Sequence, residues 1–303
     1  MGKEDKINEL MTKYIVVTGG AGFVGSNLIE YLIKKTNKKI ISIDNYSSGT
    51  KKNHIISQKV IYINGDTINI SKILKSQKKK ITTIFHFGEF SRIYQSFEKF
   101  NDCYKSNSIG TKEVIRFCLD NNIKLIYSAT SANFGNNGKD ANLSPYAYTK
   151  SKNLELLENF KKWFKFKYEV IYFYNVYGPR QIGTGKMATV IGIFENQFKK
   201  KLPLTVVRPG NQTRKFTHIN DTIEICYEAW LKNKCCYYSI FHKKAYSIKN
   251  VAKMFGGKIR YLKPRKGERF ASALTKMHLN NKIIQKYGKI NLKDYITSFI
   301  TSN

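Results

Sequence analysis

The chain has 303 residues, enough for one large α/β unit or for a core domain with a smaller lobe. Its apolar runs have the length of strands, and none approaches the roughly 20 residues that cross a bilayer, so no membrane span is expected. The formal net charge of +32 comes from lysines spread along the whole chain, which indicates solvated faces, with binding of an anionic partner such as nucleic acid as the alternative.

The five cysteines stand at irregular spacings without a CxxC pair, and the five histidines are scattered. This pattern is typical of reduced thiols in a cytoplasmic protein and argues against a disulfide framework. No two of these side chains have the spacing of a metal-ligand pair, so we expect no metal site. The first eleven residues are polar, lack the apolar segment of a secretory signal, and are expected to form a loose leader.

From Tyr14 onward, short β-branched runs alternate with longer helical stretches, the pattern of βαβ units around a parallel sheet. The predicted strands are Tyr14–Thr18, Ile40–Asp44, Val60–Asn64, Thr82–Phe87, Lys124–Ser128 and Glu169–Tyr174. The predicted helices are Gly22–Lys35, Ser106–Asn121 and Tyr146–Phe166. After Asn175, glycine and proline become frequent and the alternation fades, as expected where a second lobe begins.

These elements predict an α/β protein with a Rossmann-type, doubly wound parallel sheet and a smaller C-terminal α/β lobe. We place the first domain at residues 12–175 and the second lobe at residues 176–303. Part of the segment 214–240 is expected to pack back on the first domain.

The first predicted strand leads directly into three glycines and a helix. Gly19, Gly22 and Gly25 permit a tight turn and a close approach of the backbone to a pyrophosphate, and the helix N-terminus offers N–H groups to it. About twenty residues further on, Asp44 ends the second strand, where a carboxylate binds the adenosine ribose and repels a 2′-phosphate. The spacing therefore predicts binding of NAD. Asp66 follows the third strand and is expected to face the adenine, with a plain turn residue as the alternative.

Tyr146 and Lys150 lie four residues apart at the start of a predicted helix, on one face of it. A tyrosine near its free pKa of about 10 is a poor base at neutral pH. A neighbouring ammonium and an oxidised nicotinamide favour the phenolate and make the side chain a usable general base. Tyr148 and Lys152 form a second pair at the same spacing; Tyr146 is favoured because it follows Pro145 at the mouth of the helix.

The chain resembles the extended short-chain dehydrogenase/reductase family, in its nucleotide-sugar epimerase and dehydratase branch. The matching positions cover nearly the whole chain after Met11, in the order of the family. They are the segment 18–26, Asp44 with Asn45, His86, Asn107 with Gly110 and Thr111, the segment 128–135, Tyr146 with Lys150, the segments 175–181 and 214–218 with Asp221, and the segment 264–268.

The resemblance implies roles for these positions. Thr130 would hydrogen-bond the sugar hydroxyl, Tyr146 would be the catalytic acid and base, and Lys150 would hold the nicotinamide ribose. Cofactor contacts are implied for Gly19, Gly22, Phe23, Val24, Gly25, Asp44, Asn45, Asp66 and Lys150. Substrate contacts are implied for Ser91, Thr130, Asn175, Arg214, Arg265 and Ser272. Arg214 and Arg265 would grip the diphosphate, with a surface salt bridge as the alternative for each, and the small Ser272 would admit an N-acetylated sugar.

The family's 4,6-dehydratases carry an Asp-Glu pair directly after the catalytic threonine, and its decarboxylases carry a glutamate at the second of these places. This chain has Ser131 and Ala132 there. The resemblance therefore implies an NAD-dependent epimerase of a nucleotide-diphospho-sugar, acting at C4 through a 4-keto intermediate. A 4-keto reductase that uses NADH or NADPH is the alternative enzyme. A dinucleotide-binding regulatory protein, or one that binds nucleic acid, is the alternative outside enzymes.

Three positions depart from the family pattern: Glu89 where small residues are usual, Tyr172 where arginine is common, and the segment 208–210. They leave the identity of the sugar and of its nucleotide (UDP, GDP or dTDP) open. The helix Tyr146–Phe166 is apolar around much of its circumference, which suits either burial in a large monomer or a subunit seam. The resemblance implies a homodimer through this helix and Ser106–Asn121, with no membrane or nucleic-acid partner.

Overall fold

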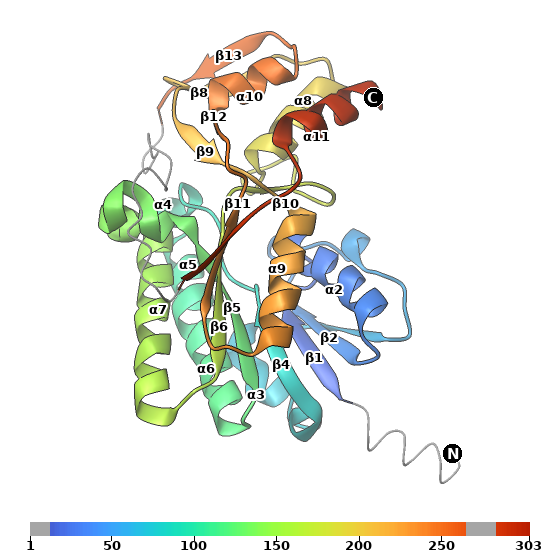
Figure 1. The fold of residues 1–303 in the computed structure, drawn as a ribbon, viewed down its shortest axis with the longest axis vertical. Coiled ribbons are helices and arrows are strands. Elements are labelled where there is room, and N and C mark those ends of the chain that lie inside the picture. The colour runs from blue at the N-terminus through green and yellow to red at the C-terminus, as the bar shows by residue number, and fades with distance from the viewer. Residues whose placement is uncertain (1–12, 265–282) are drawn as a thin grey trace.

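The computed structural model describes residues 13–264 and 283–303. Its centre is an eight-stranded sheet in the order β14-β11-β6-β5-β4-β1-β2-β3, with every neighbouring pair parallel (Figure 1). The strands are β1 (Tyr14–Thr18), β2 (Lys39–Asp44), β3 (Val60–Asn64), β4 (Ile81–His86), β5 (Lys124–Thr130), β6 (Tyr168–Phe173), β11 (Tyr237–Phe241) and β14 (Ile283–Tyr287). The predicted α/β fold with a doubly wound parallel sheet is confirmed.

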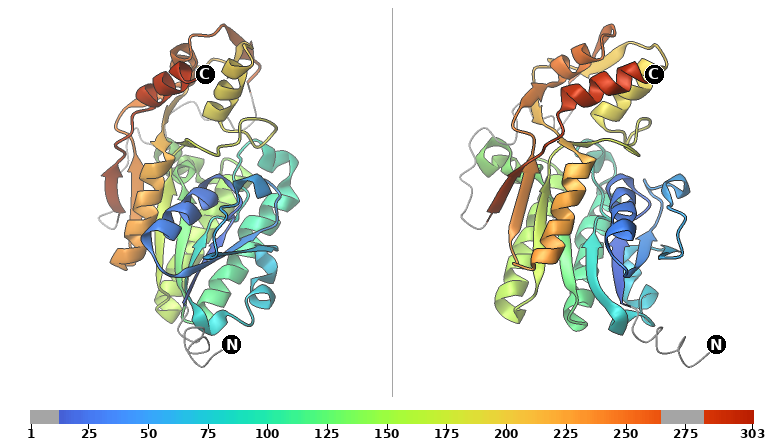
Figure 2. Two further views of the ribbon diagram at one scale, coloured as in Figure 1. Left: turned by 90° about the vertical axis from the view of Figure 1, so that its right-hand side faces the viewer. Right: turned by 45° about the vertical axis from the view of Figure 1, so that its right-hand side comes forward.

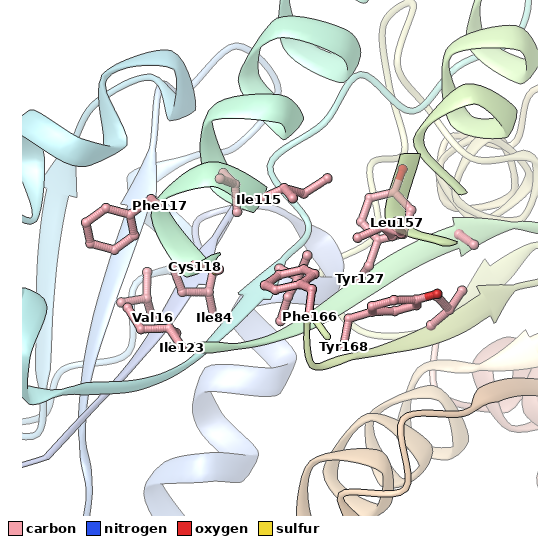
Figure 3. Close-up of a cluster of buried hydrophobic side chains, with 14 of the residues drawn as sticks. Val16, Ile84, Ile115, Phe117, Cys118, Ile123, Tyr127, Leu157, Phe166 and Tyr168 are labelled. Carbon is pink, nitrogen blue, oxygen red and sulfur yellow. The ribbon is translucent and has the colours of Figure 1, made fainter. Parts of the chain in front are cut away.

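Helices cover both faces of this sheet (Figure 1). On one face lie α2 (Phe23–Lys35) and α9 (Ile219–Lys232), and on the other lie α3 (Ile70–Ile73), α6 (Thr111–Asp120) and α7 (Pro145–Phe164). Successive residues of a strand point to opposite faces, and β1 follows this rule: Val16 belongs to the core cluster beneath α6 and α7, whereas Val17 belongs to the cluster beneath α2 and α9. Figure 3 shows part of the first cluster, with Val16 and Ile84 of the sheet near Ile115 and Cys118 of α6.

The order of the strands reverses between β1 and β4. From β1 the chain builds outward through β2 and β3, then returns to the other side of β1 and continues through β4, β5 and β6. Such a reversal opens a crevice beyond the carboxyl ends of the two central strands, where open α/β sheets bind their ligands. Thr18 and His86, the last residues of β1 and β4, are paired in register. The loops that follow them are therefore neighbours at the crevice.

The C-terminal part of the chain forms a smaller lobe above this crevice (Figures 1 and 2). It contains a parallel pair, β8 (Leu204–Val207) with β13 (Ile259–Leu262), and an antiparallel pair, β9 (Thr213–Lys215) with β12 (Ala245–Ser247). Its helices are α8 (Val190–Lys199), α10 (Ile248–Met254) and α11 (Leu292–Thr301), packed around a core of their own. A short parallel pair, β7 (Val176–Tyr177) with β10 (Thr217–His218), is also present. Between β9 and β12 the chain returns to the large sheet through α9 and β11.

The structure refines the predicted helices. The prediction Ser106–Asn121 corresponds to a π-helical turn over Lys105–Gly110 followed by α6, and two short helices, α4 (Gln95–Glu98) and α5 (Phe100–Tyr104), precede it. 3₁₀ segments occupy Lys51–Asn53, Thr67–Asn69, Lys78–Lys80 and Ser131–Asn142. Near the end of α7, Trp163 is 63% and Phe164 is 52% exposed, so the described part of this chain leaves that end of the helix largely uncovered and the subunit seam remains a prediction.

Within residues 13–264 and 283–303, no helix is both long enough and apolar enough to cross a membrane.

Candidate active site

A cavity of about 900 Å³ lies where the strand order reverses, between the large sheet and the smaller lobe. Its floor comes from the glycine turn after β1, the loop after β4, the end of β5 and the first turn of α7. The smaller lobe contributes residues of α8, β8 and β9 to the lining. A cavity of this size holds a large organic ligand, and both parts of the chain contact whatever fills it.

The glycine turn is shaped for close backbone packing. Gly19 has a φ of +70°, and a Cβ there would lie 2.8 Å from the backbone of Phe87 and Gly88. A Cβ on Gly25 would lie 2.2 Å from the carbonyl oxygen of Gly19. The helix α2 that follows has no side-chain cap at Gly22, so the N–H groups of its first turn are left for a ligand. Phe23 and Val24 line the cavity beside them.

Asp44 lines the same end of the cavity and is 8% exposed. Its two carboxylate oxygens accept hydrogen bonds from the backbone N–H groups of Ala21 (2.9 Å) and Tyr46 (2.8 Å). Burial raises the pKa of Asp44, and these backbone donors oppose the rise. A carboxylate fixed about twenty residues after the glycine turn fits the adenosine ribose of NAD.

Asn45 and Asp66 are also predicted to contact the cofactor, and they differ in whether they line the cavity. Asn45 lines the cavity and donates from Nδ2 to Asp66 at 3.3 Å. The Asp66 carboxylate caps the 3₁₀ segment Thr67–Asn69 by accepting from the N–H of Ile68 at 3.1 Å. Gly65 and Thr67, on either side of Asp66, are the residues of this loop that line the cavity.

Of the two Tyr/Lys pairs in the sequence, Tyr146 and Lys150 line the cavity. Ser144 caps α7 by accepting from the N–H of Ala147 at 3.1 Å, which fixes the start of the helix directly before Tyr146. Tyr148 is 43% exposed. Lys152 forms an exposed ion pair with Glu155, so the second pair lies on the outer side of the same helix.

The remaining predicted residues divide into those around the cavity and those outside the described chain. Thr130, at the end of β5, accepts from the N–H of Ala132 at 3.1 Å and so keeps its hydroxyl proton for another acceptor. Ser91, Thr130, Asn175 and Arg214 line the cavity. Asn175 donates to the carbonyl of Lys215 at 2.8 Å, and Arg214 donates to that of Thr213 at 2.8 Å. Arg265 and Ser272 lie outside the described residues.

The loop after β4 places a buried carboxylate against the candidate catalytic lysine. Lys150 Nζ forms an ion pair with Glu89 Oε2, donates to the carbonyl of Ser128, and lies 4.4 Å from the centre of the Tyr127 ring. The side chains of Lys150 and Glu89 are 4% and 3% exposed. Burial lowers the pKa of Lys150, and the Glu89 carboxylate opposes that change. The carboxylate therefore helps to keep the lysine protonated.

The other oxygen of Glu89 is held by three donors. Oε1 accepts from Thr111 Oγ1 (3.0 Å), Tyr127 OH (3.1 Å) and Asn153 Nδ2 (3.2 Å). This shell fixes the carboxylate from α6, β5 and α7 at once. The sequence marks Glu89 as a departure from the family pattern but gives it no role, because its partners come from three other elements.

His86 joins this network to the glycine turn. Its ring is fully buried, with Nδ1 2.7 Å from Thr18 Oγ1 and Nε2 2.9 Å from Thr111 Oγ1. The Thr111 hydroxyl donates to Glu89 and therefore accepts from Nε2–H, whereas Nδ1 accepts from the Thr18 hydroxyl. This arrangement suits a neutral ring, and burial lowers the pKa of His86 to about 4.

The buried His86 gives a testable pH dependence of stability. An unfolded histidine has a pKa of about 6.5, above the folded value of about 4, so between these pH values the unfolded chain binds a proton that the folded chain does not. We expect the contribution of His86 to the free energy of unfolding to be intact above pH 6.5 and to fall by up to roughly 3 kcal/mol as the pH drops to 4. Urea unfolding of wild type and His86→Gln across this range measures the difference. Equal pH slopes for the two proteins would contradict the assignment.

Comparison with known proteins agrees with this geometry. Residues 15–235 match the NAD dependent epimerase/dehydratase family. The chain belongs to this family. It is an enzyme, and its cofactor is NAD, for which the glycine turn and Asp44 are suited.

Two relatives and one solved structure illustrate the likeness. The chain is 30% identical over 305 residues (93% of this chain, 95% of the relative) to a protein of Methanocaldococcus jannaschii provisionally named UDP-glucose 4-epimerase. It is 30% identical over 224 residues (70% of each chain) to the ADP-L-glycero-D-manno-heptose-6-epimerase of Brachyspira hyodysenteriae. The UDP-N-acetylglucosamine 4-epimerase of Methanobrevibacter ruminantium, solved with UDP-N-acetylmuramic acid, is 25% identical with a TM-score of 0.81, covering 96% of this chain and 99% of that one. Sugar epimerases are thus among the relatives of this chain.

Proposed function

We propose that this protein is an NAD-dependent epimerase that inverts C4 of a UDP-sugar through a 4-keto intermediate. The observation that carries the proposal is the convergence of Thr130, Tyr146 and Lys150 on one cavity with the dinucleotide-binding turn. Ser131 and Ala132, which follow Thr130, carry no acid that could drive elimination of water. The site is therefore equipped to move one hydride and one proton.

Within this proposal each side chain has a defined task. Bound NAD supplies the hydride acceptor and donor. Tyr146 takes the proton of the 4-hydroxyl as C4 is oxidised and returns it to the carbonyl oxygen when C4 is reduced on the other face. The ammonium of Lys150 favours the phenolate of Tyr146, and Thr130 donates a hydrogen bond to the same sugar oxygen. Arg214, on β9 of the smaller lobe, lines the same cavity and binds the diphosphate about which the keto sugar turns.

The relatives support C4 and UDP over the other choices. The Methanocaldococcus relative, named for C4 of UDP-glucose, matches 93% of this chain, whereas the Brachyspira enzyme, named for C6 of an ADP-sugar, matches 70%. The Methanobrevibacter structure is also a 4-epimerase of a UDP-sugar. A 4-keto reductase remains the alternative, because it would use the same Tyr146 and Lys150 but would release its cofactor after each turnover.

The proposal is tested by incubating the purified protein with single UDP-sugars, without added cofactor, and following the sugar signals by NMR. We expect interconversion of a pair of C4 epimers, because the hydride removed from C4 returns to the same carbon and NAD is not consumed. Addition of NADH should not be needed. Turnover only of a 4-keto sugar, and only with stoichiometric NADH or NADPH, would identify the reductase instead.

A further inference from the structure

Arg92 places a cation in the cavity close to the candidate catalytic tyrosine. It lies in the loop between β4 and α4, directly after Ser91, and it lines the cavity together with Tyr146. Its side chain is half-buried. Burial lowers the pKa of Arg92, and the phenol of Tyr146 opposes that change. The loop that carries Arg92 leads into α4, where Ser96 Oγ accepts from the N–H of Tyr146 at 3.2 Å, so the two residues lie on neighbouring segments.

Backbone carbonyls hold the guanidinium in place. Nε and Nη2 donate to the carbonyl of Met187 at 2.9 and 2.6 Å, and Nη1 donates to the carbonyl of Ser91 at 3.0 Å and to its Oγ at 3.5 Å. Carbonyl oxygens fix the orientation of the side chain but do not neutralise its charge. A guanidinium carries five N–H groups, so these contacts leave donors available.

The two lysines that line the cavity, among the described residues, have carboxylate partners. Lys150 is paired with Glu89, and Lys186 is paired with Glu98 at 3.0 Å. Over residues 13–264 and 283–303, no aspartate or glutamate lies within ion-pair distance of Arg92. A partly desolvated cation that lacks a counter-ion is favourably placed to bind an anion that enters with the ligand.

We propose that Arg92 binds a carboxylate on the sugar ring of the substrate, so that the enzyme acts on an acidic UDP-sugar of the uronic-acid class. This inference rests on the proposed function. Arg214 stands on β9 of the smaller lobe and is assigned to the diphosphate. Arg92 lies in the loop that leads into α4, and Ser96 of α4 accepts from the N–H of Tyr146, the residue that handles the reacting hydroxyl. The anion opposite Arg92 is therefore on the sugar. The N–H groups that these contacts leave can donate charge-assisted hydrogen bonds to a carboxylate.

The test compares two ligands that differ at one position. UDP-glucuronate carries a carboxylate at C6 where UDP-glucose carries a hydroxymethyl group, and UDP alone carries neither. Isothermal titration of the NAD-loaded protein should show UDP-glucuronate binding at least about 10-fold more tightly than UDP-glucose, since one charge-assisted hydrogen bond contributes roughly this much. In Arg92→Gln this ratio should fall to near one. Lys186→Gln, which removes a neutralised lysine from the same wall, should keep the wild-type ratio.

The outcomes separate this inference from the proposed function. Equal binding of both UDP-sugars to the wild type overturns the role of Arg92 and leaves the nucleotide-sugar function standing. An equal loss of affinity for both in Arg92→Gln also overturns it, and indicates that Arg92 supports the cavity wall or the phenolate of Tyr146 instead. Failure of UDP and of both UDP-sugars to bind overturns the proposed function together with this inference.

Discussion

Tyr146→Phe is expected to lower the turnover of the UDP-sugar by roughly 10³-fold while the protein still binds NAD. The substitution keeps the ring but removes the hydroxyl that carries the proton to and from the sugar, and general acid–base groups commonly contribute a factor of this order. The groups assigned to NAD binding, the glycine turn and Asp44, do not include the phenol. Interconversion is measured by NMR and NAD binding by titration calorimetry on the same preparation.

Tyr148→Phe provides a matched control for this experiment. It removes the same hydroxyl from the same helix two residues further on, where the side chain is 43% exposed and faces away from Lys150. We expect its turnover to stay within about 2-fold of the wild type, because surface changes away from the site have small effects. If Tyr146→Phe retained comparable activity, the acid–base role of Tyr146 would be wrong.

Glu89→Ala is expected to lower the free energy of unfolding by about 3–5 kcal/mol. The substitution leaves the ammonium of Lys150, 4% exposed in the intact protein, without its carboxylate, and an unpaired buried charge is costly to this degree. It also strands the donors of Thr111, Tyr127 and Asn153. The free energy is measured by urea unfolding at neutral pH.

A double-mutant cycle separates this ion pair from ordinary loss of packing. Glu89→Ala combined with Lys150→Met removes both charges, so we expect the double variant to be clearly more stable than the sum of the single effects implies. Glu98→Ala is the control, because its ion pair with Lys186 is 43% and 73% exposed and should contribute about 1 kcal/mol or less. If the single effects were additive, or if Glu98→Ala lowered the free energy of unfolding as much as Glu89→Ala, the buried ion pair would contribute no more than an exposed one.

The parts of this protein that sequence reasoning predicts well depend on neighbours along the chain. The strand β1, the glycine turn and α2 follow from consecutive residues, because a β-branched run, positive φ at Gly19 and a helix start are local properties. Tyr146 and Lys150 are one helical turn apart, so their common face is also a local result. Asp44 belongs to the same group, since it ends the next strand of a regular βαβ unit.

Other features depend on where distant segments meet, and only the folded chain decides them. The sequence does not show that β11 and β14 extend the large sheet, because a strand's neighbours depend on the path of the whole chain. Glu89 and Lys150 are 61 residues apart, and Arg92 and Met187 are 95 residues apart. Periodicity and spacing carry no information on such pairs. The sequence by itself therefore determined the first six strands of the sheet, the cofactor turn and the Tyr/Lys pair. The tertiary structure decided how the sheet is extended and which charges surround that pair, because strand pairing and charge interactions act through space and not along the chain.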